Sequence, residues 1–114
     1  MRLYLAGPMR GIPEYNFPAF FAAERHLIGI GHQVFNPARA DMEWDGFNPK
    51  CDEPHDEAHY MARDLPEVCK ADAVAVLPGW ESSKGAALEV YVARVLGKPV
   101  LWATTLWPVV EQTK

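Results

Sequence analysis

The feature that most constrains the fold is a short apolar run, DAVAVLPG, at residues 72–79. Between Asp72 and Pro78 every residue is alanine, valine or leucine, with no alternation of apolar and polar side chains. A strand with one face in water alternates, whereas a strand covered on both faces does not. Strands of the second kind belong to parallel sheets, whose neighbouring strands are joined by helical crossovers. The run therefore predicts a central strand in a layered α/β fold.

The segments around this run alternate between strand and helix patterns. Apolar runs predict strands over residues 2–7, 32–37 and 98–104, and helical spacing predicts helices over 17–31, 55–71 and 84–96. The resulting order is typical of right-handed βαβ units. We expect a single-domain, Rossmann-like or flavodoxin-like three-layer sandwich with a mainly parallel sheet of four to five strands. The 114 residues leave room for one domain only, spanning 1–114.

One segment does not follow this alternation. Residues 38–54 carry turn formers and little periodicity, so they predict a long loop. Loops of that length inside small domains are usually functional covers or mobile segments. If this loop covers a ligand, its residues Trp44, Asp45 and Phe47 would influence which ligand fits.

A glutamate occupies the apolar face of the helix predicted over 84–96. Ser83 is the expected N-cap, and Gly97 and Pro99 end the helix. Positions three, four or seven residues from Glu89 share its face, and they are Gly85, Ala86, Val92, Ala93 and Leu96. Glu89 lies six residues past Ser83, too far for a capping box or for the helix dipole to explain it. A buried ion pair and a catalytic carboxylate remain as explanations.

Composition excludes several classes of partner. The formal net charge is −4, so no broad basic surface is available for nucleic acid or for an anionic membrane. The N-terminal apolar stretch is too short for a signal peptide, and no apolar run reaches the length of a membrane span. Cys51 and Cys69 have no CxxC spacing, which suits a reducing compartment. We expect a soluble cytoplasmic protein.

Motifs for common cofactors are missing. The segment AGPMRG after the first strand is not GxGxxG, and no GxxxxGK[ST] occurs, so we expect no cofactor. The segment HDEAH places His55 and His59 one helical turn apart, with Cys51 upstream. The zinc protease pattern needs glutamate directly after the first histidine, where this chain has Asp56. Solvent-exposed histidines at a loop-to-helix junction are the favoured interpretation, and we expect no metal site.

The turns at 7–8 and 78–79 mark the expected ligand edge. Parallel sheets bind ligands outside the carboxyl ends of their strands, and both turns follow predicted strands. Arg10 and Gly11 come next, where a guanidinium and backbone N–H groups can take a phosphate. The alternative is a surface arginine beside a turn. Trp80 follows the central strand, so we expect it to contact the ligand.

Asp64 has two possible roles. The segment DLPE at 64–67 has the form of a helix start, with Asp64 as N-cap and Pro66 in the first turn. A structural cap and a catalytic acid look alike in sequence.

Three segments together carry a resemblance to a known family. YLAGPMRG, ARDLPEVCKADAVAVLPG and SSKGAALEVYVARVLGKPV resemble the nucleoside 2-deoxyribosyltransferase superfamily over about residues 1–102, most closely its small bacterial and bacteriophage branch. The superfamily includes transferases that exchange nucleobases and hydrolases that cut the N-glycosidic bond of deoxynucleoside 5′-monophosphates. The resemblance implies Glu89 as the nucleophile, Asp64 as the residue that assists departure of the base, and Tyr4 as the residue that orients Glu89.

The resemblance also implies a substrate. Arg10 and Ser83 match positions that hold the 5′-phosphate in the hydrolases, which favours an enzyme that hydrolyses a (deoxy)nucleoside 5′-monophosphate. Pro8 stands where those hydrolases have a serine. A deoxyribosyltransferase, a non-catalytic nucleotide-sensing module and an accessory protein with a buried ion pair are the alternatives. The expected substrate-binding residues are Gly7, Arg10, Gly11, Ser83, Gly85 and Trp80.

Members of this superfamily share sites across a dimer interface. The resemblance therefore implies a homodimer or higher homo-oligomer, and Trp107 with the tail 108–114 is the segment expected to take part.

Overall fold

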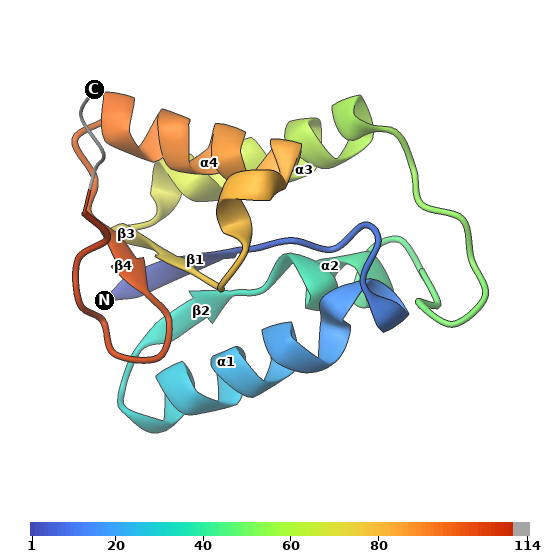
Figure 1. Ribbon diagram of the computed structural model, residues 1–114, viewed down its shortest axis with the longest axis horizontal. Helices are drawn as coiled ribbons and strands as arrows, with labels where there is room; N and C mark the ends of the chain where they lie inside the picture. The colour runs from blue at the N-terminus through green and yellow to red at the C-terminus, as the bar shows by residue number, and fades with distance from the viewer. Residues whose placement is uncertain (111–114) are drawn as a thin grey trace.

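The computed structural model describes residues 1–110, and they form a four-stranded parallel sheet between two layers of helices (Figure 1). The strands are β1 (Arg2–Ala6), β2 (Gln33–Phe35), β3 (Ala73–Val76) and β4 (Val100–Trp102), in the order β2-β1-β3-β4. The helices are α1 (Phe17–Gly29), α2 (Pro37–Glu43), α3 (Glu57–Lys70) and α4 (Lys84–Val95), with short 3-10 turns η1 (Pro13–Asn16) and η2 (Trp80–Ser82). The expected α/β sandwich with a parallel sheet is confirmed.

The two central strands send alternate side chains to opposite layers, as the period of a strand requires. From β1, Leu3 and Leu5 pack with Phe20 and Leu27 of α1. Tyr4, the residue between them, packs instead with the core beneath α3 and α4. Strand β3 is buried at all four positions, because both of its faces are covered. The alternation is what directs the Tyr4 side chain toward α4.

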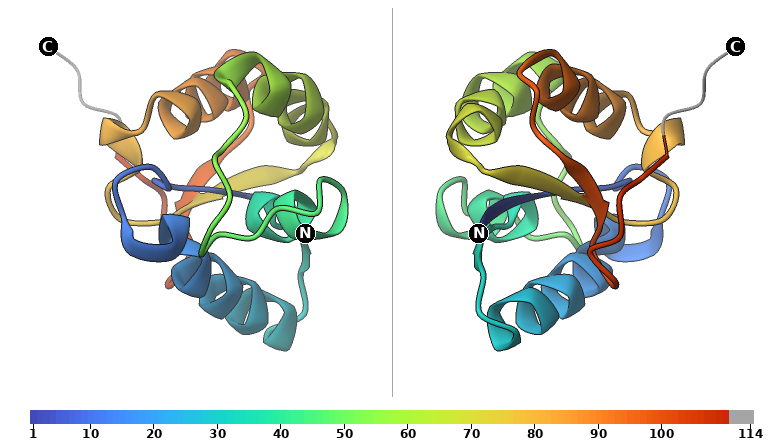
Figure 2. Two further views of the ribbon diagram at one scale, coloured as in Figure 1. Left: turned by 90° about the vertical axis from the view of Figure 1, so that its right-hand side faces the viewer. Right: turned by 90° about the vertical axis from the view of Figure 1, so that its left-hand side faces the viewer.

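The segment after β2 differs from the loop predicted over 38–54. Its first part is the helix α2, which starts at Pro37. The side chain of Asn36 caps this helix by accepting a hydrogen bond from the backbone N–H of Ala38 at 2.9 Å. The Asn-Pro pair, interpreted as the end of a strand, is thus also an N-cap followed by proline at the first helical position. Residues 44–56 then run across the carboxyl end of the sheet toward α3 (Figure 2).

Helix α3 starts earlier than the DLPE segment. Its N-cap is Asp56, whose side chain accepts from the backbone N–H of His59 at 3.0 Å. Asp64 therefore lies inside the helix, and the helix continues through Pro66. The interpretation of Asp64 as a helix cap is wrong, and its burial needs another explanation.

None of the helices described in residues 1–110 is long and apolar enough to cross a membrane. Trp107, expected at a dimer interface, is 71% exposed. Residues 111–114 of the tail expected to join that interface lie outside the described residues.

Candidate active site

A cavity of about 760 Å³ opens at the carboxyl end of the sheet. It is bounded by the segments that follow β1 and β3, by the N-terminal part of α4, and by one face each of α2 and α3. Of the residues predicted to form a site, six line it: Gly7, Arg10, Asp64, Ser83, Gly85 and Glu89. This is the edge at which parallel α/β sheets bind ligands.

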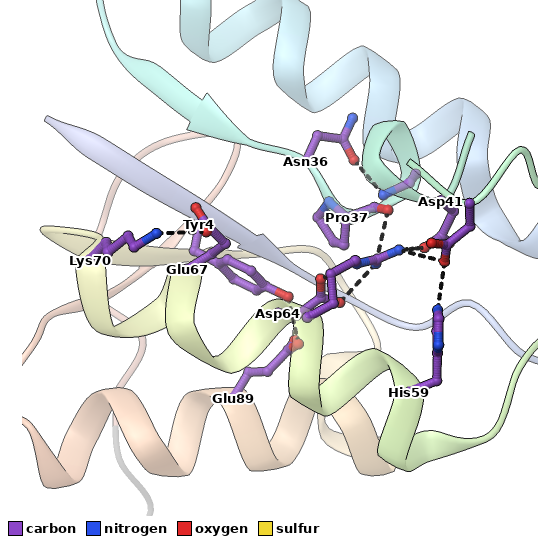
Figure 3. A network of polar contacts seen from close by, with 12 residues as sticks. Tyr4, Asn36, Pro37, Asp41, His59, Asp64, Glu67, Lys70 and Glu89 are labelled. Carbon is purple, nitrogen blue, oxygen red and sulfur yellow. Dashed lines mark hydrogen bonds and ion pairs between the residues drawn. The ribbon is translucent and has the colours of Figure 1, made fainter. Parts of the chain in front are cut away.

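Glu89 lies in the middle of α4 and is 6% exposed. The Tyr4 hydroxyl, which is fully buried, donates a hydrogen bond to its Oε2 at 2.5 Å (Figure 3). None of the ion pairs formed within residues 1–110 includes Glu89. A direct buried ion pair therefore does not explain why a carboxylate sits on this face.

The surroundings of Glu89 favour its protonated form. Burial raises the pKa of Glu89 to about 8, the charge of Asp64 adds to the rise, and the hydrogen bond from Tyr4 opposes it. Burial and then the charge of Glu89 raise the pKa of Tyr4 well above its ordinary value. Tyr4 therefore stays protonated and serves as a hydrogen-bond donor. Glu89 loses its proton near pH 8.

Asp64 is buried, and its carboxylate is held at both oxygens by the neighbouring Arg63. Arg63 Nε lies 2.6 Å from Oδ1 and Nη2 lies 3.0 Å from Oδ2. Such a two-point contact fixes the plane of the carboxylate as well as its position. Burial raises the pKa of Asp64, and Arg63 opposes that rise.

Arg63 is the centre of a cluster that was not predicted. Its Nη1 also lies 2.6 Å from Asp41 Oδ1 and 3.1 Å from Asp45 Oδ2, so one guanidinium contacts three carboxylates. Arg63 and Asp41 both line the cavity, and burial raises the pKa of Asp41 to about 6. A buried Asp64 requires a cation nearby, so the sequence could have indicated a partner such as the adjacent Arg63. Nothing in the sequence indicated that Asp41 would join the cluster, because its helix was interpreted as a loop.

The N-terminus of α4 forms one wall of the cavity. Ser83 caps the helix, accepting from the backbone N–H of Ala86 at 3.2 Å. Ser82, Lys84 and Gly85 line the cavity beside it. Backbone N–H groups at a helix start carry partial positive charge, which suits an anionic ligand.

Arg10 lies at the mouth of the cavity, half-exposed. Its Nη2 donates to the carbonyl oxygen of His55 at 2.9 Å, and its Nε lies 3.3 Å from Glu57 Oε1. Ion pairs this exposed are weak, so the guanidinium can exchange Glu57 for a ligand anion at small cost.

One of the predicted glycines allows close packing around the cavity. A Cβ atom at Gly7 would lie 2.9 Å from the Cβ of Leu77, so only glycine fits between β1 and the end of β3. A Cβ at Gly85 would lie 3.4 Å from Met61 Cε, an ordinary van der Waals contact. Gly11 is not part of the lining; it has φ 82°, a turn conformation that favours glycine.

Trp80, expected to contact the ligand, is not part of the cavity lining. The turn η2 directs its indole against α4, where it forms a second, shallow groove with Ala87, Val90 and Tyr91. The Arg94 guanidinium lies 5.8 Å from the centre of the indole ring. Gly79, with φ 87°, produces the turn that takes Trp80 away from the cavity.

Part of the cavity lining is aromatic. Tyr15, Phe17, Phe20 and Phe47 line it and pack in one core cluster. Tyr60 also lines the cavity, but its hydroxyl accepts from the N–H of His55, beside Arg10. Of the three loop residues expected near a ligand, only Phe47 belongs to the lining; Trp44 packs on Phe35 and Asp45 contacts Arg63. The cavity thus combines aromatic side chains, three buried carboxyl groups (Asp41, Asp64 and Glu89) and a helix N-terminus.

Comparison with known families matches residues 1–102 to a family described as a domain of unknown function, DUF4406. The chain belongs to this family. No curated protein gives a significant sequence match. Among solved structures, this DUF4406 domain is similar to a 2-deoxyribosyltransferase from the psychrotolerant bacterium Bacillus psychrosaccharolyticus, with a TM-score of 0.64 and 25% sequence identity.

The similarity covers 90% of this chain and 71% of the transferase chain. It confirms the resemblance to the nucleoside 2-deoxyribosyltransferase superfamily, and with it the expected fold and the expectation of an enzyme. In a DUF4406 domain of this fold, the cavity at the carboxyl end of the sheet is the candidate active site.

Proposed function

We propose that the protein hydrolyses the N-glycosidic bond of a (deoxy)nucleoside 5′-monophosphate, releasing a free base and a sugar phosphate. The observation that carries the proposal is the Tyr4–Glu89 pair. A carboxyl group is buried beside a ligand-sized cavity, with a tyrosine hydroxyl as its partner and without an ion pair to any residue in 1–110. Burying a carboxylate costs free energy. A role for Glu89 as the nucleophile that attacks an electron-poor sugar carbon would explain why the fold buries it.

In the first step, the ionised Glu89 attacks C1′ of the sugar as the C1′–N bond breaks. The bonding pair leaves with the base, which takes a proton from the Asp64 carboxyl group. Tyr4 holds Oε2 of Glu89, which leaves Oε1 for the attack. The product of this step is a glycosyl ester of Glu89, as in retaining glycosidases.

In the second step, water attacks C1′ of that ester. Asp64, now a carboxylate, takes a proton from the water, and Glu89 is released with its bonding pair. The sum of both steps is nucleotide plus water giving base plus sugar phosphate. Arg63 holds the Asp64 carboxylate at two points, so Asp64 keeps one orientation through both proton transfers.

The phosphate end of the site favours a nucleotide over a nucleoside. Ser83 and the first N–H groups of α4 provide donors, and Arg10 and Lys84 provide charge at the cavity mouth. We place the 5′-phosphate there and the base among the aromatic side chains of the lining.

The test is a panel of deoxy- and ribonucleoside monophosphates and their nucleosides, with free base resolved by chromatography. We expect base release from one or a few monophosphates and none with Glu89→Gln. In Arg10→Gln, we expect KM for the monophosphate to rise at least about tenfold, while any nucleoside activity stays unchanged. Tight nucleotide binding that Glu89→Gln does not alter, with no product from the unaltered protein, would instead identify a sensor.

Base exchange is the second candidate function, favoured by the similarity to a 2-deoxyribosyltransferase. In that reaction a free base, in place of water, attacks the glycosyl ester. Adding an acceptor base distinguishes the two: a new nucleoside or nucleotide indicates transfer, and unchanged release of free base indicates hydrolysis.

We further propose that the protein is a cytoplasmic homodimer. Support comes from Tyr91, Val95 and Trp107, whose apolar side chains are 65%, 67% and 71% exposed. Cys51 and Cys69 are free, which suits a reducing compartment. Light scattering after size-exclusion chromatography gives the mass of the particle, and a monomer at micromolar concentration would contradict a homodimer.

A further inference from the structure

We propose that Asp45, His55 and His59 form a site for a divalent transition-metal ion, zinc in the first instance, at the edge of the cavity. One donor atom from each residue lies within 4.8 Å of the other two. Asp45 comes from the segment after α2, His55 from the residue before the N-cap of α3, and His59 from the first turn of α3. None of the three residues is among those proposed to act on the substrate, but Asp45 contacts Arg63 and the carbonyl oxygen of His55 accepts from Arg10.

The missing ligand of the HDEAH segment is supplied from elsewhere in the chain. His55 and His59 are one helical turn apart, but the glutamate of the zinc protease pattern is absent. Asp45, 14 residues before His59, places its Oδ2 2.8 Å from His59 Nε2. Two imidazoles and one carboxylate are a common ligand set of zinc, with the remaining positions taken by water.

The two imidazole rings are already adjacent, stacked with their centroids 4.0 Å apart. Ligand atoms at 2.0–2.2 Å from a tetrahedral zinc ion stand about 3.3 Å from one another. The Asp45 Oδ2–His59 Nε2 separation of 2.8 Å is shorter than that value, so an ion would replace the hydrogen bond between these two residues. The other donor atoms lie within 4.8 Å, and His55 is exposed and has room to rotate. Small rotations of side chains therefore close the site without movement of the backbone.

The backbone around the two histidines is held in place. The N–H of His55 donates to the Tyr60 hydroxyl at 2.9 Å, and its carbonyl oxygen accepts from Arg10. The N–H of His59 donates to the N-cap residue Asp56. Fixing the ligands before the metal arrives lowers the entropic cost of binding.

A metal ion here would tie the segment 44–56 to α3. Phe47 and Pro54 of that segment line the cavity, so the ion would fix one of its walls. Asp45 also contacts Arg63, which holds Asp64. The site is thus placed to stabilise the cavity, with no part in the chemistry.

The experiment is calorimetric titration of the full chain with zinc sulfate, after removal of any polyhistidine tag and of metal by EDTA. We expect one zinc ion per chain. We expect binding at least about tenfold weaker in His55→Ala and in His59→Ala, because each removes a ligand. His26→Ala is the matched control, since His26 is another exposed helical histidine, far in sequence from the site, and its affinity for zinc should match the unaltered protein.

His55 is exposed, so His55→Ala keeps the fold and its result stands even if variants of Asp45 are unstable. Absence of saturable binding, or equal binding in His55→Ala, would overturn the proposal. Cobalt(II) provides a second readout: its visible bands should appear without a thiolate-to-metal band, because no cysteine belongs to the ligand set. A thiolate band that disappears in Cys51→Ser would overturn this ligand set.

Discussion

The carboxyl groups at the cavity are stabilised in two different ways. Asp41 and Asp64, both buried, and the half-buried Asp45 surround the guanidinium of Arg63. Glu89 has a neutral partner, the Tyr4 hydroxyl. Burial raises the pKa in both cases, and Arg63 opposes the rise at Asp41 and Asp64, so the pKa of Asp41 reaches about 6 whereas that of Glu89 reaches about 8. The cation fixes the position of the carboxylates around it, and the neutral partner leaves Glu89 with the larger shift.

Removing the guanidinium of Arg63 should have the largest effect on stability. Arg63→Met leaves three carboxylates without their shared partner, and we expect the free energy of unfolding to fall by about 3–5 kcal/mol at pH 7. Urea denaturation measures it. Arg2→Met is the control, because the Arg2–Glu67 pair is exposed on the arginine side and should contribute at most about 1 kcal/mol. Similar losses in the two variants would mean that the Arg63 cluster does not stabilise the fold.

Glu89→Gln should raise the free energy of unfolding above that of the unaltered protein at neutral and alkaline pH, and it should abolish activity. The unfolded chain ionises Glu89 near its ordinary pKa of 4.5, whereas the folded chain holds the proton until about pH 8. Unaltered protein therefore loses stability as pH rises through this window, by an amount on the order of a few kcal/mol. Glutamine has no proton to lose, so the variant should lack that decline.

Thermal unfolding between pH 5 and pH 9 tests this. The two proteins should be closest at pH 5 and furthest apart above pH 8. If Glu89→Gln is less stable than the unaltered protein at pH 8, Glu89 is a structural partner of a buried cation.

The Tyr4–Glu89 pair and the Arg63 cluster also differ in how far the sequence predicts them. The strand at β3, the limits of α4 and the burial of Glu89 follow from local rules, namely alternation along strands, helix caps and helical spacing. The placement of Tyr4 opposite Glu89 follows from the same alternation once the sheet is formed. The predicted roles of Glu89, Asp64 and Tyr4 came instead from the family resemblance, and they stay predictions.

The Arg63 cluster could not be predicted in this way. Its carboxylates come from α2, from the segment after α2 and from α3, and only the folded chain brings them together. Helix α2 has seven residues, too few for a clear periodic pattern. The direction of Trp80 depends on the positive φ of Gly79, and a Pro-Gly pair is compatible with several turns.

Activity should follow the ionisation of both Glu89 and Asp64. Attack needs Glu89 as a carboxylate while Asp64 still carries its proton, so we expect kcat/KM for base release to be bell-shaped in pH, with an alkaline limb at an apparent pKa near 8. Tyr4→Phe removes the hydrogen bond that lowers the pKa of Glu89. We expect the alkaline limb to move to higher pH and the rate at pH 7 to fall about tenfold or more, because a smaller fraction of the protein then has Glu89 ionised and Asp64 protonated. An unmoved limb in Tyr4→Phe would mean that another group controls the profile.

The smallest expected effect concerns the start of the helix that carries Glu89. Ser83→Ala removes the N-cap that accepts from the Ala86 N–H, and we expect the free energy of unfolding to fall by about 1 kcal/mol. Ser82→Ala is a matched control, because the Ser82 hydroxyl donates to the Gly79 carbonyl and caps nothing. If Ser83 also binds the phosphate, KM for a monophosphate rises in Ser83→Ala while the alkaline limb of the pH profile stays in place. A shift of that limb would instead mean that the helix start and the Glu89 pocket are coupled, and that the protonation of Glu89 depends on how α4 is anchored.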